Sequence, residues 1–442
     1  MKLSKEVLRL AVPSILANIT VPLVGMVDIA IAGHLNSEYG SAALIGGISL
    51  GTMLFDLLYW NFGFLRVGTG GLTAQAFGRG RKGVGSILNR ALRIALLSGI
   101  IMIAFQFLVV KLAFMVVPAS EQVQSLATQY FYIRIWAAPA TLSLFALKGW
   151  FIGMQDSVRP MVSDLLVNGI NIAASALLAL GLPGVFDGLG FAGIAIGTVI
   201  AQWSGFTYCM IALRRRYRAE IASREKPEGE SRSFFSLNRD LFLRSIGMLA
   251  VYIGFTVISA HFGDLILAVS TILMKLLMLF SYFTDGFAYA AEALTGRFIG
   301  ERNADGVRSS VRYSFYWSGF VAALFMLLYG AGGLWLFSLM TSSPEVIAAG
   351  QEYIPWLLVM PLIGCPAFVW DGVFIGATAS PQLRNSTLLC AIGFFAIWFA
   401  GRVALPSPAL ALHILMAAYF THLLVRSLYL TFSYKRTFKQ YI

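Results

Sequence analysis

The chain has 442 residues, of which 58% are hydrophobic and 12% are charged, with a formal net charge of +12 and a mean hydropathy of +0.76. An ordinary soluble domain carries about 25% charged residues, so this composition excludes one. Apolar stretches of roughly 20 to 30 residues fill nearly the whole length, which suits helices that cross about 30 Å of hydrocarbon. The sequence therefore predicts an all-α polytopic membrane protein.

Twelve membrane-spanning helices are expected. We place them at 8–34, 42–77, 87–117, 121–154, 159–181, 187–213, 239–262, 265–300, 308–340, 346–378, 382–403 and 409–433. The first apolar run has no small-residue cleavage site, so we expect a permanent helix there and not a signal peptide.

Positive charge alternates between the two sides of the predicted helices. The even-numbered connections, such as RGRK at 79–82 and RRRYR at 214–218, and both chain ends hold nearly all of the Lys and Arg. The positive-inside rule then predicts a multi-pass protein of the cell (inner) membrane with both termini cytoplasmic. The basic balance follows from this topology, so we expect no nucleic-acid partner.

The two halves of the chain resemble each other. GWFIG at 149–153 matches GVFIG at 372–376, and Tyr130 and Tyr353 keep the same offset. We expect an N-terminal lobe of six helices over 1–213, a cytoplasmic linker over 214–238 and a C-terminal lobe of six helices over 239–442. Six is even, so the lobes share one orientation and are related by a pseudo-twofold axis along the membrane normal. Such lobes enclose a cleft that suits alternating access.

Asp28 is an acid inside the first predicted helix, about 28 Å beyond Arg9 at 1.5 Å per residue. Ionisable residues within a membrane usually face a cavity or a partner. Pro22 lies six residues earlier and allows a bend, so charge at Asp28 is expected to couple to that bend. The competing interpretation is a carboxylate that reaches water at the outer interface.

A polar stripe on the fifth helix is the expected partner of this acid. Asn168, Asn171 and Ser175 follow at spacings of three and four, which puts them on one face. Thr198 of the sixth helix is expected to join them in a cluster that holds a proton or a small cation at Asp28. Ordinary hydrogen bonding between helices is the alternative.

Other intramembrane charges are candidates for function. They are Asp56, Arg66, Arg134, Lys275, Asp285 and Glu292. Lys148 and Asp371 occupy equivalent positions in the two repeats, which predicts an ion pair between the lobes that gates the inner side.

The sequence lacks the motifs that several functional classes require. The chain has no GxxxxGK[ST] motif for ATP, and its four His and three Cys show no metal-ligand spacing, so we expect no cofactor and no metal other than a Na+ near Asp28. Cys209, Cys365 and Cys390 are expected to be packing residues. A membrane transferase would need His, Asp or Glu clustered at one face, and none is apparent, so we do not expect an enzyme.

Several segments resemble the multidrug and toxic compound extrusion (MATE) family, in its DinF-like branch. The most specific are FLRVGTGGLTAQAFG at 64–78 and DGFAYAAEALTG at 285–296; VDIAIAGHL, IRIWAAPA, GWFIGMQDSVRP and NGINIA add to them. The resemblance implies a monomeric secondary exporter that exchanges small lipophilic, often cationic, compounds for H+ or Na+ while embedded in membrane lipids.

The resemblance also assigns roles to residues. The family's helix-1 aspartate falls on Asp28, its helix-5 asparagines on Asn168 and Asn171, and Thr198 is carried over with them. Many relatives have a second aspartate where this chain has Ser175, so a single acid favours proton coupling over Na+. A lipid-linked precursor flippase is the alternative transporter, although its cleft would need more basic residues.

Overall fold

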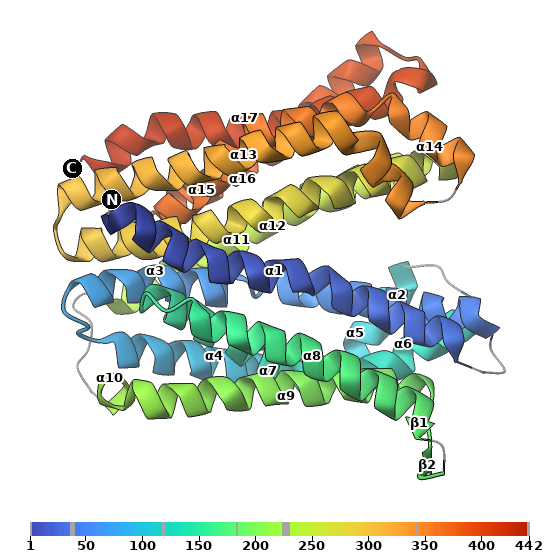
Figure 1. Cartoon of the computed structure of the whole chain (residues 1–442), viewed down its shortest axis with the longest axis horizontal. Helices are drawn as coiled ribbons and strands as arrows, with labels where there is room; N and C mark the ends of the chain where they lie inside the picture. Colours follow the sequence, from blue (N-terminus) through green and yellow to red (C-terminus); the bar gives the residue numbers. More distant parts are fainter. Residues whose placement is uncertain are drawn as a thin grey trace. The chain divides into compact units, whose positions relative to one another are not determined.

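The computed structural model describes residues 2–35, 40–116, 120–182, 184–222, 230–341 and 343–439. Within these ranges, 12 helical segments are long and apolar enough to cross a membrane. The expected all-α polytopic architecture is confirmed, and the fold is almost entirely helical (Figure 1).

The helices form two compact units. The N-terminal unit comprises 16–73 and 81–228, and the C-terminal unit comprises 1–15, 74–80 and 229–442. The elements up to residue 222 are α1 (Lys2–His34), α2 (Gly40–Trp60), α3 (Phe64–Gly78), α4 (Val84–Ala104), α5 (Gln106–Val116), α6 (Glu121–Arg134), η1 (Ile135–Ala137), α7 (Ala138–Gly153), α8 (Val158–Leu180), β1 (Gly181–Leu182), β2 (Phe186–Asp187), α9 (Phe191–Arg216) and α10 (Arg218–Ala222). Those from residue 230 are α11 (Glu230–His261), α12 (Asp264–Gly300), α13 (Ala304–Met340), α14 (Pro344–Gln351), α15 (Ile354–Gly376), α16 (Ser380–Ala404), η2 (Pro408–Leu410) and α17 (Ala411–Phe438).

The unit boundaries differ from the predicted lobes, 1–213 and 239–442, at two segments. The start of α1 belongs to the C-terminal unit, where the indole Nε1 of Trp317 donates to Ser4 Oγ at 3.0 Å. The end of α3 does so too, because Gln75 Nε2 donates to the carbonyl oxygen of Gly376 at 3.0 Å. These hydrogen bonds depend on helix packing, which hydropathy does not report.

The predicted linker, 214–238, is largely helical. It holds the last residues of α9, the short helix α10 and the first turns of α11, while 223–229 fall outside the described residues.

Several predicted single helices are divided. The second span breaks into α2 and α3 at the turn 61–63, and the third breaks into α4 and α5 at Phe105. The fourth is divided by the 3₁₀ turn η1 just before Pro139, which has no N–H to continue the ladder of α6. The tenth, predicted over 346–378, is divided into α14 and α15 near Pro355.

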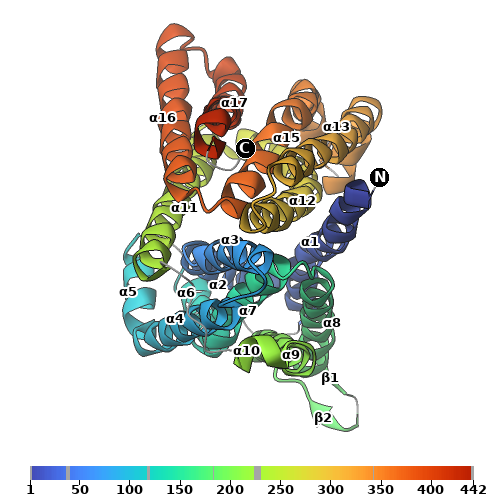
Figure 2. The ribbon, with the colours of Figure 1, turned by 90° about the vertical axis from the view of Figure 1, so that its left-hand side faces the viewer.

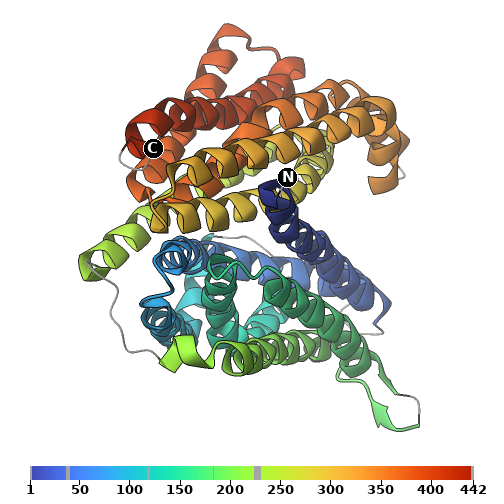
Figure 3. The ribbon, with the colours of Figure 1, turned by 60° about the vertical axis from the view of Figure 1, so that its left-hand side comes forward.

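Helices α8 and α9 run side by side in the N-terminal unit, and the hairpin β1–β2 joins them (Figures 1 and 3). A loop was expected at this connection, and the hairpin is antiparallel with Gly181 opposite Asp187. Ile31 of α1, Ala179 of α8 and Ile194 of α9 share one buried apolar cluster. This cluster holds the three helices together at the level of the polar residues described below.

In the C-terminal unit, α12 packs with α13 and α15, and α16 packs with α17 (Figure 2). Phe280 of α12 and Phe325 of α13 meet edge to face with ring centroids 5.4 Å apart, and both are buried. The three cysteines, Cys209, Cys365 and Cys390, are free and buried in the two units.

The predicted repeats make the same close backbone contact. A Cβ on Gly149 of α7 would lie 2.1 Å from the carbonyl oxygen of Arg66, and a Cβ on Gly372 of α15 would lie 2.0 Å from that of Ala288. The two glycines are 223 positions apart, the offset of the repeat. Each unit thus packs its fourth span directly on the backbone of its second, which supports an origin by duplication.

We expect Gly149→Ala and Gly372→Ala each to destabilise the protein by about 1–3 kcal/mol, because the added methyl group meets rigid backbone. Gly169→Ala in α8 and Gly319→Ala in α13 are the matched controls, since no atom lies within 4 Å of their added Cβ. These controls are expected to be neutral or stabilising, as Ala favours a helix over Gly. Unfolding midpoints in detergent micelles measure all four, and equal midpoints for clashing and control variants would contradict the expectation.

Candidate functional site

Asp28 lies on the buried side of α1. Its side chain is 6% exposed, whereas Pro22 on the same helix is exposed. The apolar cluster of Ile31, Ala179 and Ile194 fixes α1 against α8 and α9 around the acid. The Asp28 carboxyl group faces the Ser175 side chain of α8.

The polar side chains near Asp28 form one hydrogen-bonded chain. Asn171 Nδ2 donates to Thr198 Oγ1 at 2.9 Å, and Thr198 donates to the carbonyl oxygen of Ile194 at 3.3 Å. Ser175 Oγ donates to the same carbonyl at 3.2 Å. The Thr198 proton therefore points to α9, whereas Ser175 Oγ lies within reach of both the Ile194 carbonyl oxygen and the Asp28 carboxyl group, and its one proton can serve either.

Two acceptor oxygens at this site lack a donor. Asp28 Oδ1 and Asn171 Oδ1 are buried and accept no hydrogen bond within the described part of the chain. The hydrogen bonds determine which way the Asn171 amide is turned. Because Thr198 donates its proton to Ile194, its oxygen must accept from the Asn171 NH2 group. Buried acceptors without donors are costly, and a proton or a small cation would satisfy them.

Arg134 supplies positive charge to this site. Its positive charge attracts the carboxyl group of Asp28, and the carboxyl group of Asp56 also interacts electrostatically with Arg134. Its guanidinium donates to Tyr130 Oη at 3.1 Å and to Thr52 Oγ1 at 3.4 Å, and it lies 4.8 Å from the ring centroid of Phe55. The positive charge is thus held by hydroxyls and aromatic rings and is not neutralised by direct contact with Asp28.

Asn168 contacts α1 away from Asp28. Its Nδ2 donates to Thr20 Oγ1 at 2.6 Å, eight residues before the acid, which is about 12 Å along the helix. The predicted stripe therefore divides into Asn168, which ties α8 to α1, and Asn171 with Ser175, which lie by Asp28.

The remaining candidates have varied surroundings. Glu292 is fully buried in α12, Arg66 and Asp285 are half-buried, and Asp56 and Lys275 are exposed. In the described ranges, no group of three or more His, Cys, Asp or Glu residues is arranged to hold a metal ion.

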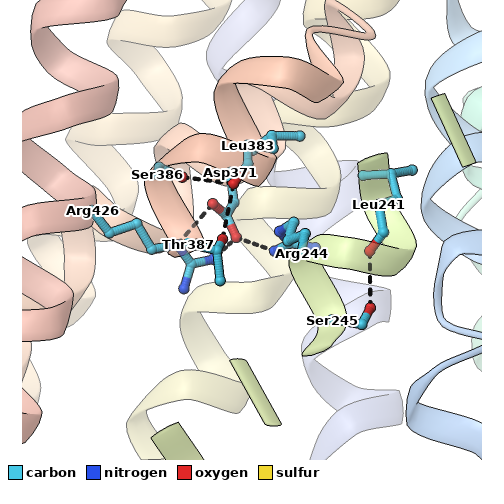
Figure 4. A network of polar contacts seen from close by, with 8 residues as sticks. All are labelled: Leu241, Arg244, Ser245, Asp371, Leu383, Ser386, Thr387 and Arg426. Atoms are coloured by element: carbon cyan, nitrogen blue, oxygen red, sulfur yellow. Dashed lines mark hydrogen bonds and ion pairs between the residues drawn. The ribbon is translucent and has the colours of Figure 1, made fainter. Parts of the chain in front are cut away.

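Lys148 and Asp371, the two residues of the predicted gate, each have a charged partner inside their own unit. Lys148 of α7 pairs with Asp164 of α8 inside the N-terminal unit. Asp371 of α15 pairs with Arg244 of α11 and Arg426 of α17 inside the C-terminal unit (Figure 4). Each charge is compensated within its own unit, and the gate between the lobes stays a prediction.

Arg244, Asp371 and Arg426 form a buried cluster, which we call the C-terminal triad. Arg426 Nε donates to Asp371 Oδ1 at 2.9 Å, and its side chain is 3% exposed. The triad ties α11 and α17 to α15 (Figure 4). Our sequence reasoning overlooked both arginines, although Arg426 lies inside a predicted span and the rule that selected Asp28 would have found it.

Comparison with known proteins identifies the family. The MatE family model matches residues 13–177 and 241–392. DNA damage-inducible protein F of Escherichia coli is 33% identical over 437 residues, covering 98% of this chain and 92% of that protein. A probable multidrug resistance protein NorM of Caulobacter vibrioides is 22% identical, covering 86% of this chain and 79% of that protein. The crystal structure of the MATE transporter VcmN of Vibrio cholerae in the bent form has a TM-score of 0.84 at 15% identity, covering 100% of this chain and 98% of that one.

The two helical units and the twelve spans define a polytopic membrane transporter. The chain belongs to the MatE family, which confirms the resemblance found in its motifs, and its strong similarity to the Escherichia coli protein confirms the DinF-like branch. Members of this family are transporters and not enzymes, so the membrane transferase alternative is set aside.

We expect Asp371→Asn to destabilise the C-terminal unit by about 3–5 kcal/mol, because it leaves two buried guanidinium groups without their acid. Asp305→Asn is the control, since that acid is 92% exposed and forms a surface pair with Arg308. Its unfolding midpoint is expected to equal that of the parent protein. Thermal unfolding in detergent tests both, and a parent-like midpoint for Asp371→Asn would show that the triad adds no stability.

Proposed function

We propose that this protein is a secondary active exporter that antiports small lipophilic, often cationic, compounds against H+, with Asp28 as the coupling acid. The observation that carries the proposal is the buried Oδ1 of Asp28, which accepts no hydrogen bond in the described part of the chain. Membership of the MatE family and the name of the Caulobacter relative, a probable multidrug resistance protein, support the substrate class.

A proton is the ligand that the surroundings of Asp28 favour. Ser175 can donate its proton either to Ile194 or to Asp28, and when it donates to Ile194 its oxygen offers a lone pair to Asp28. A protonated Asp28 has a hydrogen to donate to such an acceptor, and an ionised one does not. Burial also disfavours the charged form of a carboxyl group.

Na+ is the second candidate for the coupling ion. Asp28 Oδ1 and Asn171 Oδ1 are two oxygens of the kind that bind a hard cation. Ser175 stands where many relatives have a second acid, so one carboxylate would have to balance the ion. Arg134 nearby further disfavours a cation, because its positive charge acts on the same carboxyl group.

Coupling requires that the two ligands prefer different arrangements of the transporter, since a ligand with equal affinity for both shifts nothing. We propose that proton binding at Asp28 changes how α1 packs against α8. Asn168, which donates to Thr20, is the contact on α1 closest to Pro22 among these side chains. A bend at Pro22 would carry the change along α1.

The triad and the Lys148–Asp164 pair are proposed to act within their own units. They hold α15 and α7 at equivalent places in the two repeats, so they would keep each unit rigid while the transporter alternates. This role is separate from the predicted gate between the lobes.

The basic connections support an inner-membrane protein with both termini in the cytoplasm, since the charge bias sets orientation. We also propose that the protein acts as a monomer. Proton entry from outside would then be driven by the pH gradient and by about 2.3 kcal/mol per charge per 100 mV.

Asp28→Asn is expected to reduce ion-driven efflux to the level of empty liposomes, because the amide neither binds nor releases a proton. The unfolding midpoint should not fall, since the substitution removes a buried charge that lacks a donor. The matched control is Asp187→Asn, the same change in the exposed β1–β2 hairpin. Proteoliposomes loaded with a fluorescent cation measure efflux after a pH jump.

A parallel Na+ jump at constant pH separates the two ions. Efflux that responds to the pH jump alone supports H+ as the coupling ion. Efflux that responds to the Na+ jump alone would show that the coupling ion is Na+. Full transport by Asp28→Asn would remove this acid from the mechanism.

A further inference from the structure

A groove opens in the N-terminal unit where α4 begins and α9 ends. It has a volume of about 630 Å³ and is lined by Leu88 and Leu92 of α4, Met210, Leu213 and Arg214 of α9, and Arg218 of α10. We call it the basic groove. No residue of the Asp28 site or of the C-terminal triad lines it.

No acid of the described residues compensates the charge of the basic groove. Its lining contains two arginines and no acid. The one acid of α10, Glu220, pairs instead with Arg81 at 2.8 Å. Within the described part of the chain, neither Arg214 nor Arg218 forms an ion pair, and both are exposed. The groove therefore keeps two positive charges for an anion.

The short helix α10 is held firmly in place, so the groove is a built feature. Tyr217, which joins α9 to α10, is buried and donates its hydroxyl to Asp156 Oδ2 at 2.7 Å. Burial raises the pKa of this phenol above its usual value, which keeps it protonated as a donor. Gly85 lets α10 approach α4, since a Cβ there would lie 2.4 Å from the carbonyl oxygen of Glu220.

Polar and apolar residues are sorted by depth along the groove. Met210 and Arg214 are four residues apart on α9, so the charge lies at the end of the span and the apolar side chain lies one turn further in, while Arg218 follows on α10. Leu88 and Leu92 line the groove from α4, with Leu92 one turn further into the span than Leu88. A charged rim above an apolar wall matches a molecule with an anionic head and a hydrocarbon tail.

We propose that the basic groove binds an anionic phospholipid, with its phosphate on Arg214 and Arg218 and an acyl chain along Leu88, Leu92 and Met210. The groove lies where α4 begins and α9 ends, beside the basic connections, which is where the membrane-water boundary is expected. Basic pockets between membrane helices recognise lipid phosphates in this way. The bound lipid would brace α4 against α9 and α10.

Native mass spectrometry of the full chain in detergent tests this, by titrating phosphatidylglycerol against phosphatidylcholine with the same acyl chains. The parent protein is expected to prefer phosphatidylglycerol. Arg214→Gln/Arg218→Gln is expected to weaken that lipid about 30-fold, from roughly fivefold per arginine near an anionic headgroup. Arg215→Gln/Arg216→Gln is the matched control, because it removes the same charge from the same helix end outside the groove, and its affinity should stay near that of the parent.

A second variant tests the apolar side of the basic groove, along which the acyl chain would lie. Met210→Trp keeps both arginines and fills the groove, so it is expected to lose phosphatidylglycerol binding, and it also serves if the double arginine variant fails to fold. Equal binding of the two lipids, equal losses in the groove and control variants, or competition by glycerol phosphate as strong as by the lipid would each overturn the proposal. Asp28→Asn should keep its lipid binding, so failure here is separate from failure of the proposed antiport.

Discussion

The cost of burying charge inside a helical bundle decides how the buried charged side chains of this protein are paired. A buried ion must find an opposite charge or several hydrogen bonds, since the effective penalty is several kcal/mol per ion. Lys148 meets Asp164, and Asp371 meets two arginines. Asp28 has the charge of Arg134 and the side chain of Ser175 beside it, and one of its oxygens accepts nothing in the described part of the chain. An acid with an unsatisfied oxygen is suited to bind and release an ion.

Duplication explains why this contrast exists. The backbone contacts at Gly149 and Gly372 are the same in both units, so the scaffold has been kept. The charges have diverged, because Lys148 in one repeat corresponds to Asp371 in the other, and each is neutralised by residues of opposite sign in its own unit. An acid and a base at equivalent positions of the two repeats are thus each neutralised within their own unit.

Hydropathy predicted the twelve spans because the apolar length of a helix is fixed by the membrane. It did not predict the breaks at 61–63 and Phe105, since apolar residues continue on both sides of each break, although Pro139 was a visible signal for the break at η1. Spacing alone placed Asn171 and Ser175 on one face, and the structure places Ser175 beside Asp28 and joins Asn171 to Thr198. The partners of Asp371 were out of reach because they come from helices more than 50 residues away in the sequence. Ion pairs between helices so far apart in the sequence depend on helix packing angles, which the spacing of residues along the sequence does not predict.

The hydrogen bonds around Asp28 also bear on which ion the site prefers. Ser175 and Thr198 both donate to the carbonyl of Ile194, so that carbonyl fixes the direction of two hydroxyl groups at once. If either hydroxyl turned toward Asp28, it would leave Ile194 with one donor fewer and would stabilise the ionised acid. The Ile194 carbonyl oxygen thus competes with the Asp28 carboxyl group for the proton of Ser175. An environment that withholds donors from a carboxylate favours its protonated form, and this is the physical reason to expect H+ at a site that has lost its second acid.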